Sequence, residues 1–136
     1  MKGVYVLLMR LERDSKIRIG KLGILDFGKG YYAYVGSGMS SLEKRMERHL
    51  GKKKRKFWHV DYFLGKGKIH MIVYSETFAR KECELAEKLS GKFEGVPKFG
   101  CSDCNCRSHL FFSRKNPERD VFNVFRRSGL KPGVWN

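Results

Sequence analysis

Three side chains that can bind an anion follow one another closely after residue 30. Tyr34 lies in an aromatic run that ends at a Gly-Ser-Gly break, and Arg45 and His49 lie four residues apart in the segment that follows. Residues four apart share one face of a helix, and the amino end of a helix attracts anions. A strand end that carries a phenol and a helix that carries a guanidinium and an imidazole therefore meet in one small volume. We predict a candidate active site there.

A carboxylate interrupts an apolar pattern further along the chain. Residues 77–90 have the periodicity of an amphipathic helix, with Phe78, Leu85 and Leu89 on its apolar face and Glu82 in the middle of that face. Burying a carboxylate is costly unless a cation or a metal ion meets it. Glu82 is therefore a candidate for such a contact. The alternative is that Glu82 lies at the edge of the apolar face and pairs with a lysine.

Soft metal ligands are concentrated between residues 101 and 109. They are Cys101, Cys104, Cys106 and His109. Four such ligands are the number that a tetrahedral Zn²⁺ needs, so the set predicts a structural zinc site, although its compact spacing is not one of the common zinc-finger patterns. Two alternatives are a disulfide between two of the cysteines, and buried thiols with His109 hydrogen-bonded to Asp103. Cys83, beside Glu82, is expected to be a core residue.

A run of cations follows the helix predicted after residue 40. Such a run can be a solvated surface loop. Because it lies directly behind the proposed anion site, we favour contact with phosphates instead. The predicted nucleic-acid-binding residues of the helix and the run are Lys44, Arg48, Lys52, Lys53, Lys54, Arg55 and Lys56.

The chain as a whole is strongly basic. It has 136 residues, with 29 Lys and Arg against 14 Asp and Glu, and a net charge of +15. This excess predicts a polyanionic partner, with nucleic acid ahead of an anionic membrane surface. No apolar run approaches the roughly 20 residues of a membrane span, and no signal peptide opens the chain. We therefore expect no membrane partner and a cytoplasmic location. Abundant charge and the absence of Gln are typical of thermophile proteins.

These side chains must be positioned by strands and helices. The length of the chain and the strand and helix patterns along it predict one α+β domain over residues 1–136. The continuous apolar run at residues 3–11 is typical of a central strand. The segments at residues 17–27 and 31–36 follow it after short turns, which predicts an antiparallel meander. Later strands are expected at residues 68–74 and 110–113.

Helices are predicted between and after these strands. Ser40 and Glu43 form a capping box for a helix that ends near Leu50. A short amphipathic helix suits residues 57–64, and Thr77 can cap the helix that carries Glu82. A last helix is expected to start at Asn116 or Ser113, with Pro117 in its first turn, and to end at Gly129.

The ordered motifs resemble those of a known family. Gly3-Val4-Tyr5, Tyr34-Val35-Gly36, the later Arg45 and a Glu on a further helix are similar to the GIY-YIG endonuclease superfamily. Three longer runs are similar to its small Uri-type branch: Tyr-Tyr-Ala-Tyr-Val-Gly-Ser at 31–37, Trp-His-Val-Asp-Tyr at 58–62, and Ser-Asp-Cys-x-Cys-x-Ser-His-Leu-Phe at 102–111. The likeness covers residues 3–112.

The resemblance implies a small antiparallel sheet flanked by helices and divalent-metal-dependent cleavage of phosphodiester bonds. The catalytic residues that it implies are Tyr5, Tyr34, Arg45 and His49. One tyrosine would orient or deprotonate the attacking water, Arg45 would stabilise charge on the phosphate, and Glu82 would hold one Mg²⁺ or Mn²⁺. The other interpretation of the two tyrosines is that they only pack within the sheet.

Two functions are therefore expected. The first is a Mg²⁺- or Mn²⁺-dependent endonuclease that acts on DNA, with branched or damaged DNA in repair as candidate substrates. The second is a nucleic-acid-binding module with the same fold and no turnover. A third function, a zinc or redox sensor built on the cysteines, is disfavoured as the main role by the positive charge.

Overall fold

The computed structural model describes residues 1–52, 55–101 and 104–136. Its main element is an antiparallel sheet of six strands, in the order β6 (Glu94–Gly95), β7 (Leu110–Ser113), β4 (Gly30–Gly38), β1 (Gly3–Leu11), β5 (Lys68–Glu76) and β8 (Gly133–Val134). A separate pair is formed by β2 (Ser15–Arg18) and β3 (Ile24–Phe27), with the short 3-10 helix η1 (Gly20–Leu22) between them. The helices are α1 (Leu42–Leu50), α2 (His59–Phe63), α3 (Glu82–Ser90) and α4 (Glu118–Arg127). The predicted α+β class is confirmed.

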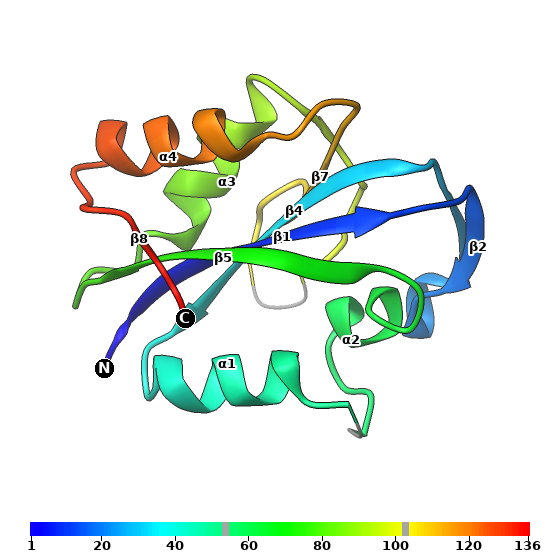
Figure 1. Cartoon of the computed structure of the whole chain (residues 1–136), viewed down its shortest axis with the longest axis horizontal. Helices are drawn as coiled ribbons and strands as arrows, with labels where there is room; N and C mark the ends of the chain where they lie inside the picture. The colour runs from blue at the N-terminus through cyan, green and yellow to red at the C-terminus, as the bar shows by residue number, and fades with distance from the viewer. Residues whose placement is uncertain (53–54, 102–103) are drawn as a thin grey trace.

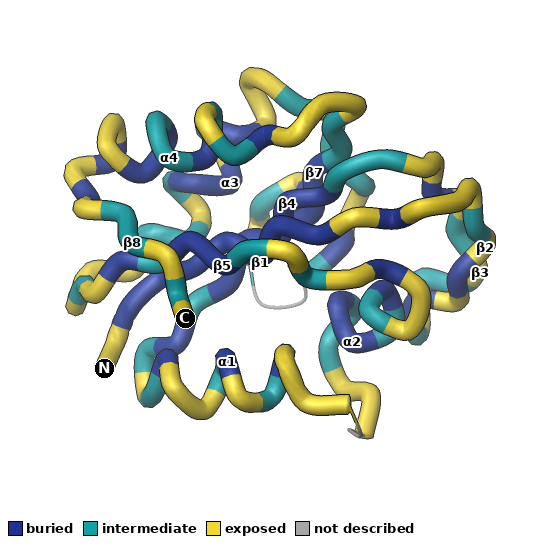
Figure 2. The backbone as a smooth tube through the Cα atoms, in the orientation of Figure 1, coloured by how far each residue is buried: buried dark blue, intermediate teal, exposed yellow. Residues whose placement is uncertain are grey.

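Strand β1 lies in the middle of the sheet, between β4 and β5. All of its residues except Arg10 are buried (Figure 2). A strand covered on both faces has no solvent side, so its sequence is continuously apolar instead of alternating. The prediction of a central strand at residues 3–11 is confirmed.

The two faces of the sheet are covered by different pairs of helices, α1 and α2 on one face and α3 and α4 on the other (Figure 1). Side chains alternate along a strand, so β1 sends Tyr5 and Leu7 to the first face and Val4 and Val6 to the second. The first face therefore carries the tyrosine predicted to act on a phosphate.

One glycine of the sheet is required by this tyrosine. Tyr5 pairs directly with Gly36 across the β1–β4 ladder. A Cβ atom at residue 36 would overlap the ring of Tyr5. The last residue of the Tyr34-Val35-Gly36 motif is therefore glycine because the phenol ring lies across its backbone.

The predicted meander is wrong. Strand β1 pairs with β4 over its whole length, and β2 pairs with β3 outside the main sheet. The physical reason is that Ile17 and Phe27 of this hairpin are buried in the core of the first face, among residues of α2 such as Phe63. Their apolar surface is covered by the helix instead of by a neighbouring strand of the sheet.

Two helix starts also differ from the prediction. Ser41, not Ser40, caps α1 by accepting a 3.2 Å hydrogen bond from the Lys44 N–H. Glu43 binds the terminal ammonium of Met1 at 2.9 Å instead of closing a capping box. Helix α3 begins at Glu82, well after Thr77.

Among the described residues, no helix has both the length and the apolar character needed to cross a bilayer.

Candidate active site

One cleft of about 760 Å³ opens where β4 leads toward α1. Four of the residues predicted to act in catalysis or to hold Mg²⁺ or Mn²⁺ line it, and each comes from a different element: Tyr5 from β1, Tyr34 from β4, Arg45 from α1 and Glu82 from α3. His109, predicted as a zinc ligand, lines it as well. The fold thus brings together side chains that are distant in the sequence.

Tyr5 lines this cleft with little of its surface, since the residue is only 1% exposed. Its Oη lies 2.7 Å from Nε2 of His49, a hydrogen-bond distance. His49 is itself 3% exposed and is not among the residues that line the cleft, but its ring lies beside those of Tyr34 and Trp58, which do. Burial and the neighbouring Tyr34 hold the pKa of Tyr5 well above its usual value, and the positive charge of Arg45 opposes this shift.

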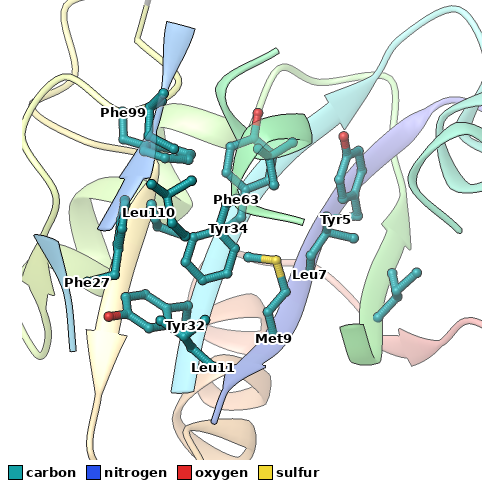
Figure 3. Close-up of a cluster of buried hydrophobic side chains, with 14 of the residues drawn as sticks. Tyr5, Leu7, Met9, Leu11, Phe27, Tyr32, Tyr34, Phe63, Phe99 and Leu110 are labelled. Carbon is teal, nitrogen blue, oxygen red and sulfur yellow. The ribbon is translucent and has the colours of Figure 1, made fainter. Parts of the chain in front are cut away.

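The second phenol of the cleft belongs to Tyr34, which is 8% exposed. Burial, followed by the negative charge of Glu82, raises the pKa of Tyr34. The phenol is therefore protonated at neutral pH and can donate a hydrogen bond to an anion. In Figure 3 the phenol oxygens of Tyr5 and Tyr34 point the same way, whereas that of Tyr32 points elsewhere and donates to the Gly28 carbonyl at 2.6 Å.

Arg45 is held in place by an aromatic ring. Its guanidinium carbon lies 4.3 Å from the centroid of the Trp58 ring, within the range of a cation–π contact. Trp58 lines the cleft as well. The contact restricts a long, flexible side chain, so the cleft contains a positive charge in a defined position. The only sequence signal for Trp58 was its place in a motif behind the basic run.

Arg48, which was predicted to bind nucleic acid, makes contacts within the protein. Its Nη2 donates to Asp61 Oδ2 at 2.6 Å and to the Arg55 carbonyl at 2.8 Å. The same carboxylate oxygen accepts the N–H groups of Phe57 and Trp58, each at 2.9 Å. Burial would raise the pKa of Asp61, but these hydrogen bonds and the charge of Arg48 lower it below its usual value. The ion pair therefore joins α1 to the segment that carries Trp58.

Glu82 is the first residue of α3 and is partly buried. The partial positive charge at the amino end of a helix stabilises a carboxylate there. Within residues 1–52, 55–101 and 104–136, no Lys or Arg forms an ion pair with it, so the lysine pairing considered from the sequence is not observed there. Mg²⁺ is commonly held by one or two carboxylates together with waters and substrate phosphates. A single carboxylate that faces an open cleft fits this type of ion.

Two further residues of the cleft were not among the predicted catalytic or metal-binding residues, although the sequence left a supporting role open for His59. Arg80 is an exposed second cation on its wall, and nothing in its sequence context indicated this. His59 lines the cleft and accepts a 2.8 Å hydrogen bond from the Gly100 N–H through Nδ1. Burial lowers the pKa of His59, so this imidazole is neutral at pH 7.

The family model described as "Domain of unknown function DUF123" matches residues 4–130. The chain belongs to the DUF123 family. Comparisons with curated proteins and with solved structures find no match. The matched range of this DUF123 chain contains Tyr5, Tyr34, Arg45 and Glu82 and the whole cysteine cluster.

The cysteine cluster of the DUF123 chain differs from the predicted one. Ligand atoms of Cys83, Cys104, Cys106 and His109 all lie within 4.8 Å of one another. Cys83 was expected to be a core residue, but it is exposed, so that prediction is wrong. Cys101 is outside this group, and its thiol contacts the Phe99 carbonyl at 3.4 Å. All four cysteines are free thiols. The alternative partner of His109, Asp103, lies outside the described residues.

The predicted basic surface is partly described. Lys44, Lys52, Arg55 and Lys56 are exposed, whereas Lys53 and Lys54 lie outside the described residues. Phe57 follows directly, is 76% exposed and lines the cleft. Exposed cations in this DUF123 chain therefore continue into an exposed aromatic ring at the wall of the cleft.

Proposed function

We propose that this protein is a metal-dependent endonuclease that hydrolyses phosphodiester bonds, with DNA as the expected substrate. The observation that carries the proposal is the convergence of Tyr5, Tyr34, Arg45 and Glu82 on one cleft, from four separate elements. The resemblance of the motifs to the GIY-YIG endonucleases, and to their Uri-type branch, supports the same assignment.

The polar groups of the cleft suit a phosphodiester. Negative charge increases on the phosphoryl oxygens as a nucleophile attacks, and a fixed cation lowers the energy of that state. Arg45, restrained by Trp58, supplies such a cation. The protonated phenol of Tyr34 donates a hydrogen bond to a phosphate oxygen or to the leaving oxygen.

Tyr5 and His49 form a route for a proton. In the proposed reaction the Tyr5 oxygen takes a proton from the attacking water as its own proton passes to His49 Nε2 across the 2.7 Å hydrogen bond. The water oxygen bonds to phosphorus, and the departing oxygen takes a proton from solvent. Burial raises the pKa of Tyr5 in the protein without bound substrate or metal. The phenol is therefore protonated when the reaction starts. His49 is thus a positioning residue that acts through Tyr5.

Glu82 would hold Mg²⁺ or Mn²⁺ at the edge of the cleft. When bound, the divalent cation neutralises charge on the phosphate and favours ionisation of water. Glu82 and Tyr34 line the same cleft, and the negative charge of the carboxylate adds to the raised pKa of the phenol.

The exposed cations beside the cleft provide a surface for the nucleic acid backbone. Lys52, Arg55 and Lys56 lie on the segment that leads to Phe57, and Arg80 lines the cleft. Basic side chains that contact phosphates supply most of the affinity that does not depend on base sequence. The proposal includes the cytoplasmic location that the sequence predicts.

The second candidate is a nucleic-acid-binding module without turnover, which the net charge of +15 favours independently of the cleft. It predicts binding that weakens by about 10³- to 10⁵-fold between 50 and 200 mM salt if about 6–10 phosphates are contacted. It also predicts no cleavage with any metal ion.

The test is a panel of labelled single-stranded, duplex, flap and junction DNA incubated with Mg²⁺ or Mn²⁺. Glu82→Ala and Arg45→Ala are expected to reduce cleavage by about 10²- to 10³-fold, the usual cost of losing one group that stabilises the transition state. Fluorescence anisotropy should show that both variants still bind DNA.

Matched controls are Glu87→Ala, an exposed carboxylate on the same helix as Glu82, and Arg119→Ala, an exposed arginine outside the cleft. Both should cleave as the wild type does. Retained cleavage in Glu82→Ala, or no product from the wild type with either ion, would refute the nuclease proposal.

A further inference from the structure

The cysteine cluster joins three parts of the chain. Cys83 lies in the first turn of α3, Cys104 and Cys106 lie between β6 and β7, and His109 directly precedes β7. Cys83 follows Glu82 in the sequence, and His109 lines the cleft. The cluster therefore borders the candidate active site, although its thiols have no role in the proposed hydrolysis.

The spacing of the ligand atoms suits one tetrahedral ion. With Zn–S bonds of about 2.3 Å, two sulfur ligands are about 3.8 Å apart, and a sulfur and an imidazole nitrogen are about 3.6 Å apart. The observed distance from Cys104 Sγ to His109 Nε2 is 3.5 Å, and all four ligand atoms fall within 4.8 Å of one another. Contraction of about 1 Å or less brings the widest pair to the tetrahedral distance.

The histidine ligand is already fixed by the fold. The backbone N–H of His109 donates to the Phe99 carbonyl at 2.9 Å. The backbone carbonyl of His109 accepts a hydrogen bond from the Val35 N–H, also at 2.9 Å. The residue is 3% exposed. A ligand with a fixed backbone loses little conformational freedom when a metal binds.

The donor types select the metal. Three thiols and one imidazole are the ligands of Cys₃His structural zinc sites, and four protein ligands leave no open position for a substrate. Mg²⁺ and Ca²⁺ require oxygen ligands and do not suit this set. From these distances and donors we infer that Cys83, Cys104, Cys106 and His109 bind one Zn²⁺.

The consequence of this site is structural. Zinc bound to Cys83 would tie the first turn of α3 to the segment before β7, and so restrain the backbone of the adjacent Glu82. This role goes beyond the proposed hydrolysis and does not depend on it. The site can be tested without any measurement of cleavage.

The experiment compares two single cysteine variants of the full chain. Protein purified with Zn²⁺ is freed of loose metal, and zinc is measured by plasma mass spectrometry, with Co²⁺ substitution to report tetrahedral thiolate ligation by absorption. We expect about one zinc per chain in the wild type and in Cys101→Ser, since Cys101 is outside the group. In Cys83→Ser the affinity should fall by about 100-fold or more, because a direct ligand costs at least as much as a supporting one.

Cys83 is exposed, so its substitution should leave the fold intact, and circular dichroism checks this. Cys106→Ser provides a second variant with the same expected loss of metal. Three results would overturn the inference: no zinc in the wild type, equal loss in Cys101→Ser and Cys83→Ser, or thiol titration that finds a disulfide within the cluster. If the protein cleaves DNA but binds no zinc, only this inference fails. If it binds zinc but cleaves no DNA, only the proposed function fails.

Discussion

The two faces of the main sheet are built from different side chains. The face under α1 and α2 is rich in aromatic residues, and three of them are buried tyrosines, Tyr5, Tyr32 and Tyr34, each with a phenol oxygen (Figure 3). The face under α3 and α4 is formed by aliphatic residues, alanine and phenylalanine, with no tyrosine among the buried residues of its described core. Because β1 and β4 contribute to both, the difference arises from alternate residues of the same strands.

This difference separates the residues of the proposed reaction from those that support the fold around them. Tyr5 and Tyr34 reach the cleft from the aromatic face, and each has a polar neighbour such as His49 or Arg45. Among the described buried hydrophobic residues of the aliphatic face there is no tyrosine, but this face seats α3, whose first residue is Glu82. One face supplies the phenols, and the other holds the helix that presents the carboxylate.

The largest effect on stability is expected from Phe125→Ala on the aliphatic face. Phe125 is fully buried between α4 and the sheet, and truncating such a residue costs about 3–5 kcal/mol through lost burial and the cavity left behind. Denaturant unfolding measures this loss. Cleavage per folded molecule should be unchanged, since no residue of α4 lines the cleft.

Phe122→Ala provides the control for this prediction because the ring is only partly buried on the same helix. Its cost should be clearly smaller. A large drop in cleavage by folded Phe125→Ala protein would show that the two faces are coupled and would break the division between chemistry and support.

Gly36→Ala, at the wall of the cleft, is expected to lower both stability and cleavage, with a smaller loss of stability than Phe125→Ala. The added methyl would overlap the Tyr5 ring, and overpacking of this kind costs about 1–3 kcal/mol. Since Tyr5 must move, cleavage should fall as well. Gly28→Ala is the control, because a Cβ there meets nothing within 4 Å. Equal stability and cleavage in the two variants would contradict the packing argument for Gly36.

Features that depend on local sequence were predictable. The continuous apolar run of β1 reflects burial on both faces, and the short apolar segment of β7 was placed at the observed residues, Leu110–Ser113. Helix α2 lies within the predicted range of residues 57–64. The start of α1 was misplaced by one serine because Ser40 and Ser41 are chemically equivalent caps, and the chain entering from β4 decides between them.

Features that depend on distant parts of the chain were not predictable. Cys101 was chosen over Cys83 because it is near the other ligands in the sequence, but folding brings α3 to the cluster and leaves Cys101 outside it. The apolar residue Phe78 suggested a longer α3, whereas it is 82% exposed and precedes the helix. Likewise, the Trp58 contact with Arg45 joins two segments whose meeting no local pattern indicates.

The smallest change in stability, and the sharpest test of the aromatic face, is expected from Tyr5→Phe compared with Tyr32→Phe. Each substitution keeps the ring and removes one hydrogen bond, from Tyr5 to His49 Nε2 at 2.7 Å or from Tyr32 to the Gly28 carbonyl at 2.6 Å. Both should lower the free energy of unfolding by about 0.5–1.5 kcal/mol in denaturant titrations.

Cleavage should distinguish the two variants. Tyr5 lines the cleft and Tyr32 does not, so only Tyr5→Phe should lose activity, by about 10²-fold or more if the phenol moves a proton in the reaction. Single-turnover assays with Mn²⁺ measure this loss on the same preparations. Equal cleavage by the two variants would reduce Tyr5 to a packing residue, like its neighbours on that face, and would leave Arg45 and Glu82 as the reacting groups of the cleft.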